Sequence, residues 1–451
     1  MTKLSKDRIK DILIKIMPYV VTMILVTIVM NLILDLGNRD FNHPFYYDGG
    51  DGAITLYRTY EMRTDHTLFG FNQLSAPYGT NTFDFYVFDI GLYIIQFLFA
   101  VLAPNFVFGF NLFLIAGAWF NALASVYALK RLKFSSGISI VLSVIYSAIQ
   151  FFTMRFNGHT YLAYFFAAPL AIVIAIELYR DEFEISFKKG KRVESSVNAF
   201  LLILIGTSGI YWAVFSCLYF LLIALLRGFE DLKIRSTIKS GITIGITVVG
   251  FLIGVLPAGI YWLINGTSEL LKARGQFLWS GEVYGLKLTE LILPNIYHRV
   301  GILYALRRNY TSTFGMNESS TASLGIVLTI GLAIALVYLF RVGNSKRSDL
   351  MKPVSLLIVA SLLIAYKGGL GTLFVIVFPY VRCYNRISVY IAFLCVVAVA
   401  WAYTGVYNFL KSKFKHKSIL NVIACIVLVL LLVYDNLNIY CVLNILFYNR
   451  I

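Results

Sequence analysis

Long apolar runs with very few charges recur along the whole chain and set its fold class. A run of roughly 20 apolar residues can cross the hydrocarbon core of a bilayer as a helix. The pattern predicts an all-α polytopic membrane protein, a single integral membrane domain over residues 1–451 with no C-terminal soluble domain. The predicted membrane runs are 14–36, 107–129, 136–154, 160–179, 195–226, 240–264, 323–341, 353–366, 388–409 and 418–435.

A further apolar run, 85–103, decides on which side of the membrane every later loop lies. Its polar residues Tyr86, Asp89, Tyr93 and Gln96 recur at helical spacing and form one stripe. Such a helix is typical of the membrane surface; the alternative is a spanning helix whose polar face lines a cavity. If the run does not cross, 25 Lys and Arg are cytoplasmic and 14 are outside, against 16 and 23 if it does. Because cytoplasmic loops are enriched in Lys and Arg, we expect a surface helix.

The run 195–226 is longer than one crossing and shorter than two. We expect two short helices that turn at the GTSG sequence, 206–209, where backbone is tolerated only if protein covers it. This hairpin gives about 11 membrane helices with a cytoplasmic N-terminus. Both large loops, 37–106 and 266–322, then lie on the outer face.

Composition excludes several classes of protein. With 59% hydrophobic and 14% charged residues, the chain cannot cover a soluble core, and it does not resemble a nucleic-acid module or a disordered tail. The net charge of +16 is explained by basic cytoplasmic loops beside anionic membrane lipids, so no nucleic-acid partner is expected. The five cysteines include no CxxC pair and are interpreted as packing residues.

Ionisable residues gather in the segments predicted to be outside. Because such residues are costly at a membrane, their clustering indicates chemistry on that face. Asp48 and Asp51 follow the first helix, and one of them could act as a general base on an acceptor hydroxyl at the membrane surface. The alternative is that Asp51 only caps the helix that follows it. Paired carboxylates could also hold a divalent cation, the one cofactor that the residues suggest.

Other outer segments add candidate binding groups. Cations around a short apolar segment that could re-enter the membrane suit a lipid phosphate, because guanidinium groups match phosphate oxygens; the alternative is ordinary binding of lipid headgroups. We predict that these cations and the carboxylates share one outer pocket. The candidates for donor phosphate are Arg386, Arg382, Lys367 and Arg155, and those for the rest of the substrate are His159, Asn157, His298 and Glu318.

The order of these features resembles the GT-C superfamily of integral membrane glycosyltransferases, and more closely the bacterial YfhO-like proteins. The resemblance covers most of the chain, but each of its motifs is short. It departs from the family in its DGGD spacing, which leaves open which Asp matches the acidic motif, and in lacking the soluble C-terminal domain of many relatives. The matching segments are the acidic outer loop with Asp48 and Asp51, APYGTNTFDF, LKRLK, RFNGHTYLAYFFAAPL, LILPNIYH, ESSTASLG and FPYVRCYNRIS.

The resemblance implies a helical module whose first outer loop, with surface helices, carries an essential acidic residue. It also implies a polyprenyl-phosphate sugar donor, with Arg386 or Arg382 at its phosphate. We therefore expect an inverting glycosyltransferase of a bacterial plasma membrane that acts on its extracytoplasmic face. The acceptor would be a cell-envelope glycopolymer, such as a teichoic acid or surface polysaccharide, or a protein. The alternatives are a flippase for a lipid-linked glycan and an inactive scaffold for envelope assembly.

Overall fold

A computed structural model describes most of the chain and is almost entirely helical. It describes residues 6–45, 51–71, 77, 80–85, 89–186, 188, 190–231, 234–269, 272, 278–296, 298, 300–413 and 417–436. Asp48 and Tyr86 lie outside the described residues. Two short strands, β1 (Gly70–Phe71) and β2 (Thr80–Asn81), pair antiparallel in the first large loop.

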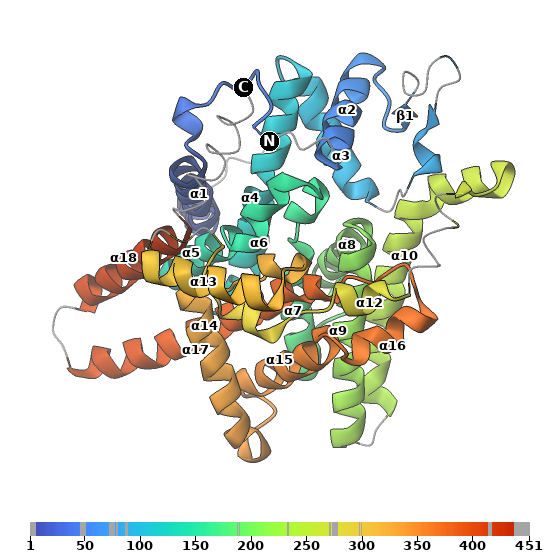
Figure 1. Ribbon diagram of the computed structural model, residues 1–451. Coiled ribbons are helices and arrows are strands. Elements are labelled where there is room, and N and C mark those ends of the chain that lie inside the picture. Colours follow the sequence, from blue (N-terminus) through green and yellow to red (C-terminus); the bar gives the residue numbers. More distant parts are fainter. Residues whose placement is uncertain are drawn as a thin grey trace.

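The α-helices follow one another with short connections (Figure 1). They are α1 (Lys6–Leu34), α2 (Asp51–Thr64), α3 (Ile90–Leu102), α4 (Phe106–Arg131), α5 (Ser136–Ser147), α6 (Gln150–Thr153), α7 (Ala167–Tyr179), α8 (Arg192–Thr207), α9 (Ile210–Asp231), α10 (Ile234–Asn265), α12 (Ser280–Val283), α13 (Gly301–Phe314), α14 (Gly325–Tyr338), α15 (Met351–Ala365), α16 (Leu370–Val377), α17 (Ser388–Lys413) and α18 (Lys417–Asn436). The 3-10 turns used below are η3 (Met154–Asn157), η4 (Thr160–Ala163), η6 (Glu318–Thr321) and η8 (Tyr384–Ile387).

Seven helical segments in the described part of the chain are long and apolar enough to cross a membrane. Each overlaps a run predicted from the sequence, Ile210–Glu230 only the second half of 195–226. The all-α class is confirmed and the helices are those expected of a membrane protein, whereas the count of about 11 stays a prediction. The seven are Lys10–Leu34, Phe106–Arg131, Ser136–Phe156, Ile210–Glu230, Thr237–Asn265, Gly325–Asn344 and Tyr384–Lys411.

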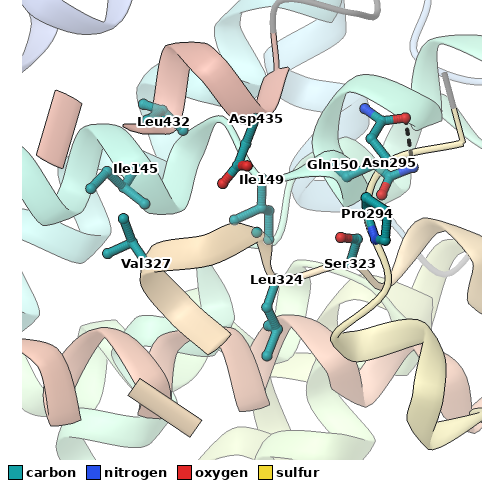
Figure 2. Close-up of a pocket in the computed structure, with 11 residues that line it drawn as sticks. Ile145, Ile149, Gln150, Pro294, Asn295, Ser323, Leu324, Val327, Leu432 and Asp435 are labelled. Atoms are coloured by element: carbon teal, nitrogen blue, oxygen red, sulfur yellow. Dashed lines mark hydrogen bonds between the residues drawn. The ribbon is translucent and has the colours of Figure 1, made fainter. Parts of the chain in front are cut away.

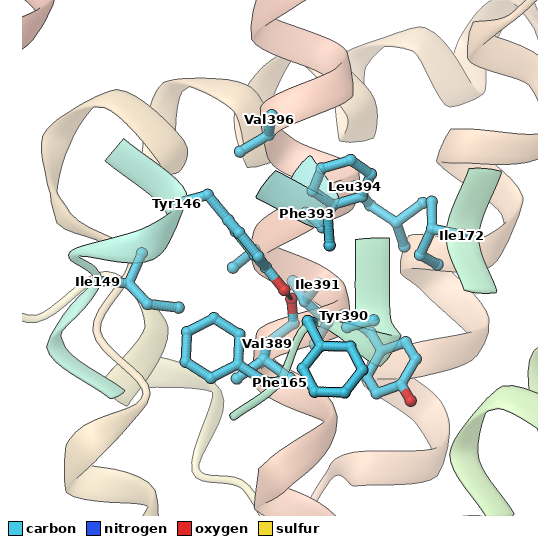
Figure 3. Close-up of a cluster of buried hydrophobic side chains, with 14 of the residues drawn as sticks. Tyr146, Ile149, Phe165, Ile172, Val389, Tyr390, Ile391, Phe393, Leu394 and Val396 are labelled. Carbon is cyan, nitrogen blue, oxygen red and sulfur yellow. Dashed lines mark hydrogen bonds between the residues drawn. The ribbon is translucent and has the colours of Figure 1, made fainter. Parts of the chain in front are cut away.

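The core lies around α7, whose sequence is apolar up to Glu177 in its last turn. Every residue of this helix is buried, as expected for a helix without a polar face. It packs against α4, α9 and α17. Figure 3 shows part of this core, where the ring of Tyr146 meets Phe165 and Phe393 edge-on, each at 5.3 Å between ring centroids. The Tyr146 hydroxyl donates to the Val389 carbonyl, so the buried polar group is satisfied.

The helix α3 is shorter than a membrane crossing, and its polar stripe faces protein. Its 13 residues extend about 20 Å, against roughly 30 Å of hydrocarbon. Tyr93 and Gln96 are buried, and Gln96 donates to Thr59 Oγ1 at 2.8 Å and to the Thr55 carbonyl at 2.9 Å. Figure 1 shows α2 and α3 side by side. That α3 lies at the membrane surface stays a prediction, and the buried part of its polar stripe binds α2.

The run 195–226 forms two helices, α8 and α9, that separate at the predicted GTSG sequence. Gly209 has φ +124°, a conformation that suits glycine, and a Cβ there would lie 2.2 Å from Asp89 Oδ1. Both helices pack against α10. Glycine lets them approach closely, since a Cβ on Gly206 would lie 2.3 Å from the Thr247 carbonyl oxygen.

One end of the helix bundle is joined by ion pairs between short basic segments. Arg131 pairs with Glu177, Arg227 Nη1 lies 2.7 Å from Asp181 Oδ2, and Lys352 Nζ lies 3.0 Å from Glu230 Oε1. The Lys239 ammonium donates to the Phe183 carbonyl at 3.0 Å. Apart from Glu177, these residues come from 130–133, 180–192, 227–239 and 341–352, which the distribution of Lys and Arg assigns to the cytoplasm. Those segments therefore share one end of the molecule.

The last described helix is held against the start of α14. Asp435 accepts a hydrogen bond of 2.7 Å from the Ile326 amide, beside a hydrogen bond from Gln150 to Asn295 of 3.2 Å (Figure 2). The cavity between them is about 30 Å³, room for a water molecule or two and not for a substrate.

Candidate functional site

A cavity of about 520 Å³ lies where the two large loops meet the helix ends. This volume is within the range of small-molecule sites, roughly 300–1,000 Å³. Its lining comes from α2, the start of α3 with the turn before it, η4, the start of α9 with the turn before it, the turn after α12, η6, and η8 with the segment before it. The polar lining residues are Asp51, Thr55, Arg58, Asp89, His159, Thr160, Glu318, Arg382 and Arg386, and the aromatic ones are Phe85, Tyr93, Tyr161, Tyr211, Trp212, Tyr284 and Tyr380.

One face of α2 forms the first wall of the cavity. Asp51, Thr55 and Arg58 follow one another at spacings of four and three, which places them on one side of a helix. They contact three consecutive residues of the RFNGHTYL segment. The Thr55 hydroxyl lies 2.8 Å from that of Thr160, and Arg58 Nη1 donates to the Tyr161 hydroxyl at 2.9 Å. This face therefore fixes the segment 159–161 against the first outer loop.

The third of these contacts joins Asp51 to His159. The Asp51 Oδ2 atom meets the Nδ1 atom of the imidazole, and both side chains are about half exposed, 51% and 50%. His159 has φ +55° and follows Gly158 at φ +121°. A left-handed backbone costs a non-glycine residue roughly 1–2 kcal/mol, so neighbouring contacts must hold this turn in place.

Glu318 and Arg386 belong to a second wall of the cavity, and Arg155 is buried behind Glu318. Glu318 Oε1 lies 3.0 Å from Arg155 Nη1 and 3.0 Å from Arg386 Nε. The guanidinium of Arg386 stacks over the Tyr211 ring at 4.2 Å, and that of Arg155 over the Phe151 ring at 4.1 Å. All three charged groups are largely shielded from solvent, which strengthens their interaction.

The charges of this wall do not cancel. Burial alone would raise the pKa of Glu318, but the charge of Arg386, followed by that of Arg155, outweighs it and holds the pKa well below its usual range. Glu318 is therefore ionised, and with two arginines the group carries a net charge of about +1. Arg382 lines the same cavity, 5.7 Å from the centroid of the Tyr284 ring, and adds a second positive charge. This side is suited to an anion.

The predicted convergence of carboxylate and guanidinium groups is confirmed for Asp51, Arg382 and Arg386, which line one cavity. His159 and Glu318 line it too. Asp48 lies outside the described residues, and so does the side chain of Asn157, whose backbone belongs to η3. The roles predicted for these residues stay predictions.

Other predicted site residues lie elsewhere. Lys367 is exposed and is not among the described residues that line the cavity; its amide donates to the Leu286 carbonyl at 3.1 Å. His298 is buried away from the cavity, with its ring 5.4 Å from that of Tyr434. Arg155 lies behind Glu318 and donates a hydrogen bond to it. Glu318 also accepts from Arg386, so its observed partners are arginines.

Sequence reasoning missed several residues of the site. Thr55, Arg58 and Tyr161 were not predicted, although the spacing of Asp51, Thr55 and Arg58 was a usable signal. Asp89 was recognised only as part of a polar stripe, yet it lines the cavity together with Arg382 and Arg386. The stripe itself was the signal, since polar residues on an apolar helix need partners.

The described residues contain no group of three or more His, Cys, Asp and Glu side chains arranged to hold a metal ion. The predicted pair of Asp48 and Asp51 cannot be judged from the described residues, because only Asp51 is among them. The structure therefore assigns no ligand set to a divalent cation.

Comparison with known proteins gives no match to a family model and no match to a curated protein.

Proposed function

We propose that this protein is an integral membrane glycosyltransferase that moves a sugar from a polyprenyl-phosphate donor to a cell-envelope acceptor with inversion. The observation that supports it is one cavity that has both an acidic residue, Asp51, and two cationic residues, Arg382 and Arg386, in its lining. Transfer of a sugar from a phosphate needs both: a group that takes the proton of the attacking hydroxyl, and positive charge for the leaving phosphate.

The donor phosphate would bind to the cationic wall. Arg382 and the net charge of the Arg155–Glu318–Arg386 group would hold its oxygens. The acceptor oxygen would approach from the side of Asp51 and form a bond to the anomeric carbon. As it does so, the bond from that carbon to the phosphate oxygen breaks, and the phosphate keeps the electron pair. The tyrosine and tryptophan rings of the lining offer flat apolar surfaces for a sugar.

The chain segment next to the cavity favours a donor attached to a lipid. The helix α16 is apolar and exposed, with Val377 at 84% of its full exposure, and Leu373 and Ile376 are exposed as well. Three residues later Tyr380 lines the cavity, followed by Arg382. A phosphate at the arginines would therefore have an apolar surface beside it for its isoprenoid chain.

We also propose the eleven-helix topology, with the cavity on the extracytoplasmic face of a bacterial plasma membrane and the N-terminus inside. Asp51 contacts His159, and two segments long enough to cross, α4 and Ser136–Phe156, lie between them with α3. Residues in contact must lie on one side, which favours an α3 that does not cross. Asp181 contacts Arg227 across α8 and α9, which favours a hairpin in which both cross. The basic segments at the other end fit the cytoplasm.

The test is transfer of radiolabelled sugar from polyprenyl-phosphate donors to envelope glycopolymer or protein acceptors by the purified protein in detergent. Asp51→Asn should lower the rate 10²- to 10⁴-fold, the usual effect of disabling a proton acceptor. Asp40→Asn is the matched control, because Asp40 also pairs with a histidine, His43, 2.8 Å away in the same loop but outside the cavity lining. The control should keep its rate within twofold.

The same experiment separates the alternatives. A flippase moves the labelled lipid across a vesicle membrane and forms no new glycosidic bond, and a scaffold does neither. Label that stays on the lipid with every acceptor, or full activity in Asp51→Asn, would contradict the proposed enzyme.

A further inference from the structure

We propose that His159 and Asp51 act as a dyad, in which His159 Nε2 takes the proton of the acceptor hydroxyl and Asp51 orients the ring. This inference rests on the proposed function and names the base within it. It differs from direct proton transfer to a carboxylate, and it assigns a catalytic role to a residue considered above only as a substrate contact.

The geometry of the pair carries the inference. Asp51 contacts Nδ1 of the ring, so a proton on Nδ1 is held by the carboxylate and Nε2 has its lone pair available. Within the described residues the structure gives the side chain of His159 no other hydrogen bond, and the residue lines the cavity with its side chain half exposed. This is the arrangement in which a carboxylate fixes the tautomer of a histidine base.

The backbone around His159 supports a role that needs fixed placement. Its left-handed φ of +55° is unfavourable, and unfavourable backbone persists only where its surroundings impose it. Here the next two residues are bound to the same face of α2, Thr160 to Thr55 and Tyr161 to Arg58. These two contacts hold the chain so that the ring of His159 meets Asp51.

The charges around the ring suit a cycle of proton gain and loss. Asp51 of α2 stabilises the imidazolium that forms when His159 takes the proton. Glu318 of η6 also interacts electrostatically with His159, but it is bound to Arg155 and Arg386. One carboxylate thus serves the histidine and the other serves the arginines.

In the proposed step the acceptor oxygen loses its proton to Nε2 and bonds to the anomeric carbon. The bond between that carbon and the phosphate oxygen breaks, and the electron pair leaves with the phosphate at the cationic wall. The imidazolium then returns its proton to the released phosphate or to water. No oxidant, reductant or further reactant is needed.

His159→Asn and His159→Gly test this role without a large disturbance of the turn, because Asn tolerates the left-handed backbone and Gly prefers it. The rate constant kcat of His159→Asn should fall 10²- to 10⁴-fold. Its KM for the polyprenyl-phosphate donor should stay within twofold, since the arginines are intact. Added imidazole should restore His159→Gly at least 10-fold, whereas thiazole, a ring of similar shape and little basicity, should not. His43→Asn is the matched control and should change neither constant.

The outcomes separate this inference from the function on which it rests. If the wild-type protein transfers sugar, His159→Asn keeps its kcat within a few-fold and Asp51→Asn is inactive, then Asp51 is itself the base and the dyad is overturned. If added divalent cation restores His159→Gly and imidazole does not, the pair serves a cation and the dyad is again overturned. If the wild-type protein transfers no sugar from any donor, the proposed function and the dyad fall together.

Discussion

At the scale of single residues, the most consequential contact is one carboxylate shared by two buried arginines. Glu318 neutralises half of the charge of Arg155 and Arg386 and holds both in place. Removing one partner of a buried ion pair typically costs about 3–5 kcal/mol, because the remaining charge is left without compensation. Glu318 is therefore expected to contribute to the stability of the folded protein as well as to the charge of the cavity.

Glu318→Ala should therefore lower the free energy of unfolding by about 3–5 kcal/mol. Thermal unfolding in detergent measures it. Glu269→Ala is the control, because the pair of Glu269 and Lys272 is exposed and such pairs contribute at most about 1 kcal/mol. Equal melting temperatures for the wild type and Glu318→Ala would contradict the buried pairing.

A second variant, Glu318→Gln, tests how the stability contributed by Glu318 depends on pH. Because the folded protein holds the pKa of Glu318 well below its unfolded value of about 4.3, its contribution is complete above that value and is lost as pH falls. The difference in stability between the wild type and Glu318→Gln should be constant from about pH 7 to 5 and shrink toward pH 3. A difference that grows on acidification would refute the lowered pKa.

Arg382 and Lys367 offer a matched pair of cations on either side of α16, and of the two only Arg382 lines the cavity. Arg382→Ala should weaken binding of polyprenyl phosphate about 10- to 100-fold, the usual contribution of a hydrogen bond to a charged group. Lys367→Ala should change it less than twofold. Titration of the purified protein with the lipid measures both affinities, and equal losses would argue for general attraction to anionic lipid.

At the scale of elements, close approach of α8 to α10 brings the α8–α9 turn up to the cavity. Gly206 meets the α10 backbone, and three residues later Gly209 lies against Asp89 and lines the cavity. A side chain at position 206 would therefore separate two helices and displace part of the site.

Gly206→Ala should destabilise the protein by about 1–3 kcal/mol, since a Cβ would come 2.3 Å from the Thr247 oxygen. Gly245→Ala on α10 is the control: a Cβ there meets nothing within 4 Å, so the change should be neutral or stabilise by up to about 1 kcal/mol. Thermal unfolding of both variants is the measurement. A tolerated Gly206→Ala would mean that the helices can separate at low cost.

The sequence predicted the elements well because apolar length alone identifies a membrane helix. It also located the break at 206–209 and the polar stripe at Tyr93 and Gln96. It could not tell what the stripe faces, since a stripe that binds water and one that binds another helix have the same spacing. The structure shows that the stripe binds another helix, because Gln96 donates a hydrogen bond to Thr59 on α2.

The site was predictable only as a group of segments. The sequence brought Asp51 and Arg386 to one side of the membrane through the distribution of charge. It could not show that Glu318 lies between Arg155 and Arg386, because those contacts join residues 163 and 68 positions apart. It wrongly placed Lys367 and His298 in the site for the same reason, because the type of a residue and the loop that carries it do not determine where its side chain points.

At the scale of the whole molecule, charged contacts gather at two ends of an apolar body. Ion pairs such as Arg227 with Asp181 close one end, and the cavity occupies the other. The exposed Asn309 lies on α13, in the loop 266–322 assigned to the outer face. The exposed Asn344 ends the segment Gly325–Asn344, on the side assigned to the cytoplasm.

In a variant without its native cysteines, Asn309→Cys should react with a membrane-impermeant maleimide on intact cells. Asn344→Cys should react only after the membrane is made permeable. Mass analysis of the labelled protein measures both. The reverse pattern would invert the topology, and reaction of both on intact cells would refute a crossing between them.

The face of α2 that grips residues 159–161 has a consequence for how such a sequence can vary. Asp51 contacts His159, Thr55 contacts Thr160 and Arg58 contacts Tyr161, so each of these three residues of α2 has one partner in the segment 159–161. A substitution on either side leaves its counterpart without a suitable neighbour. In natural relatives of this chain, the two residues of each contacting pair should therefore covary, so that both are substituted in the same lineage.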